Sequence, residues 1–208
     1  MSTHHSLVLF QGDVTARLPE IFKCFDYTMT DHTETVSGME TIWERTNWPL
    51  RHRPRDTVHK AVLCNGPWTG LLDREMSIIT KKKKCEQCAK EFGIKIFGYF
   101  SESVSGSCGF YLFNPTLERE FFMQDNVVLV DEGDPLPEEA GLTLDTVIES
   151  GVMTIARHLG FPDTLIGDPK VKVQIVELQF MLESKNLDLT HNPSHRKPEE
   201  KKNWWRFW

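Results

Sequence analysis

The sequence has no long apolar run, and no stretch reaches the roughly 18 consecutive apolar residues that a membrane-spanning helix needs. Its first residues also lack the basic start and apolar stretch of a secretory signal. The five cysteines are scattered and odd in number, which fits a reducing compartment better than a disulfide framework. We therefore expect a cytoplasmic protein that does not use a membrane as its partner.

Lysine and arginine are missing from residues 120–156, a stretch that contains nine acidic residues. This segment carries a charge of −9 against −6 for the whole chain, so the remainder carries +3. A nucleic-acid-binding protein would show a basic patch instead, so nucleic acid is not an expected partner. A local field of one sign attracts a partner of the opposite sign. The pattern therefore favours a protein partner with a basic surface.

The most distinctive part of this segment is a loop, residues 130–145, with the sequence VDEGDPLPEEAGLTLD. Two prolines restrict its backbone, and a glycine permits a turn. Carboxylates are costly to bury without partners, so they are expected to face solvent or another protein. A plain solvated loop and a protein-facing acidic patch both fit this pattern. The predicted partner-binding acids are Asp131, Glu132, Asp134, Glu138 and Glu139.

The order of strand-like and helix-like segments predicts an α+β fold, with a mostly antiparallel sheet and helices packed on one face. Residues 58–182 are the expected core domain. Residues 1–57 give weak signals and are expected to be an irregular region packed on that core. Residues 183–208 form a polar tail that ends in aromatic side chains. The predicted helices cover residues 77–92 and 144–159, each followed by glycine.

Cys85 and Cys88 form a CxxC motif, which can be half of a zinc site or a redox pair. A zinc site needs two further ligands at a matching spacing, and no second CxxC is present. Both cysteines fall instead on the apolar face of the first predicted helix. They are expected to be reduced core residues, and neither a metal nor a cofactor is predicted.

Two other classes of function stay open. A small hydrolase-like enzyme could use the loop around Ser105, although neither a nucleophile-elbow motif nor a phosphate-binding motif accompanies it. A scaffold subunit could instead use the aromatic tail, whose large residues are Trp204, Trp205, Phe207 and Trp208. Four exposed aromatics would equal or exceed the apolar patch of a typical monomer. We therefore expect the tail to dock on the body of the protein or to anchor a partner.

The stretch GFYLFNPTLEREFFMQDNVVLVDEGDPLPEE, the later RHLGFP and the terminal WWRFW are similar in style to a group of small bacterial cytoplasmic proteins. Some members of that group are immunity partners of delivered toxins. The resemblance implies a non-enzymatic protein that binds and blocks one toxin domain, and it assigns no role to a particular residue. An acidic inhibitor would complement a toxin whose active site is basic.

Overall fold

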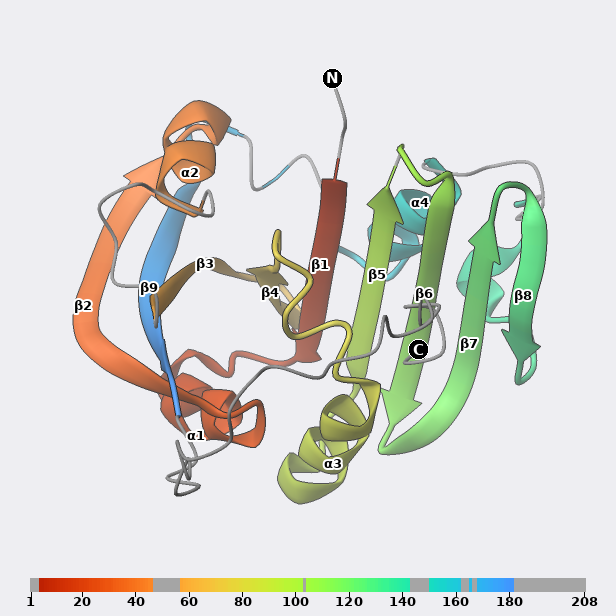
Figure 1. The fold of residues 1–208 in the computed structure, drawn as a ribbon, viewed down its shortest axis with the longest axis horizontal. Coiled ribbons are helices and arrows are strands. Elements are labelled where there is room, and N and C mark those ends of the chain that lie inside the picture. Colours follow the sequence, from red (N-terminus) through yellow and green to blue (C-terminus); the bar gives the residue numbers. More distant parts are fainter. Residues whose placement is uncertain are drawn as a thin grey trace, which may run out of the picture.

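The computed structural model contains one antiparallel sheet of nine strands, in the order β2-β9-β3-β4-β1-β5-β6-β7-β8 (Figure 1). The residues that it describes are 4–46, 57–102, 104–142, 150–161, 165 and 168–181. The strands are β1 (His4–Gln11), β2 (Tyr27–Ser37), β3 (Thr57–Asn65), β4 (Trp68–Leu72), β5 (Ile96–Glu102), β6 (Ser107–Asn114), β7 (Thr116–Gln124), β8 (Val127–Glu132) and β9 (Lys172–Phe180). This confirms the predicted α+β class and the antiparallel sheet.

Helices cover both faces of this sheet, whereas we expected them on one. They are α1 (Leu18–Cys24), α2 (Met39–Thr46), α3 (Lys82–Phe92) and α4 (Ser150–His158), with short 3-10 turns η1 (Thr15–Arg17) and η2 (Pro137–Glu139). Buried residues of α1 and α3 belong to one core, and those of α2 and α4 belong to the other. Figure 1 shows α3 in front of the sheet and α4 behind β5 and β6.

Strand β1 shows why two cores form. Val8 and Phe10 pack in the core that contains α1 and α3, and Leu7 and Leu9 pack in the core that contains α2 and α4. Successive side chains of a strand point to opposite faces, so a strand covered on both sides is apolar at consecutive positions. The continuous run LVLF is therefore typical of a central strand.

The amino-terminal region, which we expected to be irregular, supplies the middle of the sheet. Strand β1 pairs with β4 on one side and with β5 on the other. Residues 4–46 also form α1, β2 and α2. The described part of residues 1–57 is thus inseparable from the predicted core domain, since the sheet would lose its central strand without it.

Helix α4 is fixed to the sheet through β4. The indole nitrogen of Trp68 donates a hydrogen bond of 2.7 Å to the carbonyl of Leu159, just after the helix. The ring of Phe161 covers Gly70, where an added Cβ would lie 2.2 Å from Cζ of that ring. Only a glycine lets the ring approach the strand so closely. Part of the predicted helix, residues 144–149, lies outside the described residues.

Candidate functional site

The acidic loop is attached to the sheet by one arginine. Arg119 lies on β7 with 2% of its surface exposed, on the strand face that also carries Phe121 and Met123. Its Nε donates to Oε1 of Glu139 at 2.9 Å, and its Nη2 donates to Oε2 at 3.0 Å. This two-point geometry is the strongest form of an arginine–carboxylate pair. It makes Glu139 a buried structural residue and removes it from the predicted binding surface.

The remaining guanidinium nitrogen of Arg119 binds the start of the same loop. Nη1 donates to the carboxylate of Asp131 and, at 3.2 Å and 3.4 Å, to the carbonyls of Glu132 and Gly133. The pKa of Arg119 is raised, first by its hydrogen bond to Glu139. A single side chain therefore joins residues 131–133 to residue 139, and the segment between them is closed into a short loop.

Local contacts fix the shape of this loop, residues 131–139. Gly133 has φ of +83°, and an added Cβ would lie 2.0 Å from the carbonyl oxygen of Glu118. The backbone N–H of Leu136 donates to Glu139 at 2.8 Å, and its side chain packs against the core. Nδ1 of His158 lies 2.9 Å from the carbonyl of Glu138, which links the loop to the end of α4.

The five predicted acids therefore divide into two groups. Asp131 and Glu139 are paired with Arg119. Glu132 and Asp134 are exposed, Glu138 is half-buried, and none of their carboxylates forms an ion pair with a described residue. Elsewhere in the acidic segment, Glu120 is paired with Lys82, while Asp145 and Glu149 lie outside the described residues. The loop is thus held by two acids, of which only Glu139 is buried, and its three other acids have no described ion partner.

Strand β8, which leads into this loop, is the edge of the sheet next to β7 (Figure 1). Val127, Val128 and Leu129 are 57%, 41% and 48% exposed. The described residues therefore leave both faces of the strand largely open at these three positions, whereas the next residue, Val130, packs against the core. Unpaired edges with apolar side chains favour association with another segment.

The CxxC motif lies in the core, as its helical spacing predicted. Cys85 and Cys88 are fully buried in α3, and burial raises the pKa of Cys85 to about 12. Sγ of Cys85 lies 3.0 Å from the hydroxyl of Tyr111. Burial also raises the pKa of Cys88 well above its usual value. Thiols held in the neutral form are poor nucleophiles and poor metal ligands. No cluster of three or more metal-ligating side chains occurs among the residues that the structure describes.

Ser105, the residue considered for a hydrolase, lies in the turn between β5 and β6. Its hydroxyl donates to the carboxylate of Glu102 at 2.8 Å. In the described part of the chain, neither a histidine nor a lysine contacts this hydroxyl. Activation of a serine needs an adjacent general base that is itself oriented by a third group. The geometry around Ser105 therefore gives no support to the enzymatic alternative.

A buried polar cluster on the other half of the sheet was missed by the sequence analysis. Lys60 on β3 is fully buried and donates to Asp73, to Glu75 and, at 2.9 Å, to Ser77. The carboxylate of Asp73 also accepts the backbone N–H groups of Ile78 and Ile79 at 2.7 Å and 2.8 Å. The cluster thus holds the segment that leads into α3.

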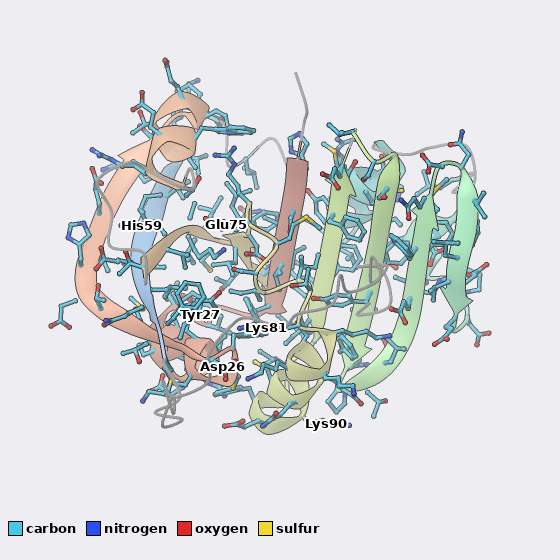
Figure 2. The ribbon with its side chains drawn as sticks, in the orientation of Figure 1. Asp26, Tyr27, His59, Glu75, Lys81 and Lys90 are labelled. Carbon is cyan, nitrogen blue, oxygen red and sulfur yellow. The ribbon has the colours of Figure 1, made fainter. Side chains whose placement is uncertain are left out.

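The electrostatics of this cluster argue for a structural role. Burial by itself lowers the pKa of Lys60, but the carboxylates of Asp73 and Glu75 outweigh it and hold the pKa above its usual value. A lysine held protonated cannot take a proton from Ser77, so the two do not form a nucleophilic pair. Tyr27, which Figure 2 labels close to Glu75, is fully buried, and burial raises the pKa of its hydroxyl.

The aromatic residues Trp204, Trp205, Phe207 and Trp208 lie outside the described residues. Among the described helices, none is long and apolar enough to cross a membrane. No family model matches the chain, and the searches of curated proteins and of solved structures also returned no match.

Proposed function

We propose that the protein is a non-enzymatic binding module that blocks a basic protein, as an immunity protein blocks its toxin. The observation that carries this proposal is the loop of residues 131–139, in which Arg119 holds two acids while Glu132, Asp134 and Glu138 have no described ion partner.

The rigidity of the loop supports a role in recognition. Ordering a loop when it binds costs free energy, and a loop that is already fixed avoids much of that cost. Here Arg119, the hydrogen bond to Leu136 and the contact with His158 fix both ends of the loop before any partner arrives. The three outward acids therefore keep their positions when they meet a complementary cationic surface.

The charge pattern supports fast and selective association. Residues 120–156 carry −9, and the residues outside this segment carry a net positive charge. A concentrated field attracts a basic partner and raises the association rate, by about tenfold or more at low salt. It also repels acidic proteins and nucleic acids, which gives selectivity.

The test uses a basic protein domain that binds the purified protein, and it measures their association rate by stopped flow at several salt concentrations. The triple variant Glu132→Lys, Asp134→Lys and Glu138→Lys should associate at least about tenfold more slowly at low salt and should lose most of the salt dependence. Its melting temperature should stay close to that of the natural chain, because these side chains form no ion pairs with described residues.

A matched control carries Asp31→Lys, Glu40→Lys and Glu44→Lys. These three acids are exposed on β2 and α2, at the opposite end of the sheet, and their reversal changes the net charge equally. The control should associate nearly as fast as the natural chain. If both variants associated equally slowly, the slower association would come from the change in net charge alone, and this would contradict the proposed site. Equal binding of an unrelated lysine-rich protein would contradict specific inhibition.

A further inference from the structure

Strand β8 is the one place in the described structure where large exposed hydrophobic side chains are consecutive. The exposed large hydrophobics are Met39, Val104, Val127, Val128, Leu129 and Met181, and only the three on β8 adjoin one another. Acids stand at both ends of the strip, with Asp125 in the turn before it and Asp131 after it. A ligand for this strip therefore needs an apolar body with cationic groups on its flanks.

The carboxyl end of the chain has this composition. Lys201–Trp208 contains four aromatic side chains, two lysines and one arginine, and it contains no acidic side chain. Five extended residues, 204–208, span about 17 Å, and the six residues of β8 span about 20 Å. The segment thus matches strand β8 in length, and it supplies the apolar and cationic groups that the strip requires.

The connecting chain is long enough for this contact. Strand β9 ends at Phe180, and β8 lies seven strand positions from β9 in the sheet. At about 4.8 Å between neighbouring strands, the separation across the sheet is roughly 34 Å. The 23 residues 181–203 can extend to about 75 Å, so they can follow an indirect path over the surface.

We propose that residues 204–208 pack along β8 of the same chain and cover Val127, Val128 and Leu129. Lys201, Lys202 and Arg206 then lie near Asp125 and Asp131. Charge argues against a second copy as the occupant, because pairing two β8 strands would bring together two acidic segments of −9 each. The inference goes beyond the proposed function and holds whether or not the acidic loop binds a basic protein.

Photo-crosslinking of the full chain tests this contact. Trp205 is replaced with the aromatic photoreactive residue p-benzoylphenylalanine, and an equal mixture of ¹⁴N-labelled and ¹⁵N-labelled chains is irradiated at low concentration. Mass spectrometry should map the crosslink to residues 125–132, with both ends carrying the same isotope. A crosslink between different isotopes, a crosslink to another part of the fold, or no crosslink would each overturn the proposal.

Two further variants of the chain with p-benzoylphenylalanine at position 205 test whether the strip itself binds the tail. Each of them has one exposed apolar residue changed to lysine. Leu129→Lys places a cation and a polar chain within the strip and should lower the crosslink yield by about tenfold. Val104→Lys makes the same change at an exposed turn between β5 and β6 and should leave the yield unchanged. Equal yields from the two variants would show that the strip does not bind the tail.

Discussion

Arg119 and Glu139 face each other with two parallel hydrogen bonds, Nε to Oε1 at 2.9 Å and Nη2 to Oε2 at 3.0 Å. Both side chains are buried, and they join strand β7 to the far end of the acidic loop. The shape of the most negatively charged part of the chain therefore depends on one positive side chain.

Replacing Arg119 with methionine should lower the free energy of unfolding by about 3–5 kcal/mol, because Glu139 would stay buried without its cation. Urea denaturation measures this change. The double variant Arg119→Met with Glu139→Leu should recover much of the loss, since two apolar residues can replace a buried pair. If the double variant were as unstable as the single one, the loss would have to come from packing rather than from the unpaired carboxylate.

Changing Lys60 to methionine should also cost about 3–5 kcal/mol, because it leaves Asp73 and Glu75 without their cation. The exposed pair of Lys90 with Glu86 offers a control, and Lys90→Met should cost less than about 1 kcal/mol. Thermal or urea unfolding compares the two. Similar losses would show that Lys60 contributes no more than a surface lysine.

The same lysine predicts a pH dependence. The folded state raises the pKa of Lys60, so its stabilisation is complete below the unfolded-state pKa of about 10.4 and decreases as the pH rises through the folded-state value. The free energy of unfolding of the natural chain should therefore fall above about pH 10.4. The Lys60→Met variant should lack this decrease in the free energy of unfolding above about pH 10.4. If the free energy of unfolding fell equally in the natural chain and in the variant, the decrease would come from other titrating groups.

Thiol labelling should separate the cysteines by burial. At pH 8 iodoacetamide should modify the exposed Cys64, while Cys85 and Cys88 should react only after unfolding. Burial raises the pKa of Cys85 to about 12 and that of Cys108 to about 11, so few thiolates form at pH 8. Mass spectrometry of the native and denatured protein reads the result. Rapid native modification of Cys85 would contradict its place in the core.

Gly133 and Gly12 form a matched pair for a substitution test. Both have positive φ, +83° and +86°, so alanine costs about 1–2 kcal/mol of backbone strain at either position. At Gly133 the new Cβ would also lie 2.0 Å from the carbonyl of Glu118, whereas nothing lies within 4 Å at Gly12. Gly133→Ala should therefore destabilise more than Gly12→Ala in urea denaturation. Equal losses would mean that the loop yields easily at Gly133.

Turns and helix ends that depend on a few neighbouring residues could be predicted from the sequence. The hairpin turn at Asp125 and Asn126 has positive φ at both residues, as turn residues of this kind allow. Helix α3 ends at Gly93 in the left-handed conformation, as expected. It begins at Lys82 rather than near Ser77, because Asp73 accepts the backbone N–H groups of Ile78 and Ile79 and holds the preceding turn. These hydrogen bonds to Asp73 cannot be predicted from the spacing of apolar residues in the helix.

Strand β9 has a sequence pattern that two different structures can explain. Its apolar residues change parity between Ile175 and Val176, which occurs at a bulge and also in a strand that is covered on both faces. The pairing of β9 with β3 continues without a shift through both residues, and each residue packs in a different core. The irregularity lies in β2, between Met29 and Thr33. Because both faces are covered, apolar side chains occur at consecutive positions without any bulge.

The sequence located the acidic loop, but it did not show which of its acids pair with Arg119 and which do not. The stretch without basic residues begins at residue 120, directly after Arg119. The alternation of Arg119, Phe121 and Met123 on one face was the available signal that this arginine is buried. A buried arginine requires carboxylate partners, and nearby acids were the obvious choice. Which two of the five acids pair with Arg119 depends on tertiary geometry that no periodicity encodes.

The position of β9 has a consequence for how the chain is made. Strands β2 and β3 are consecutive along the sequence, yet β9 lies between them and pairs with both. A nascent chain must therefore expose those two strand edges until residues 172–180 have left the ribosome, several seconds or more after β3 at about 5–20 residues per second. A chain interrupted before residue 172 would keep both edges open and would be a ready substrate for chaperones and proteases.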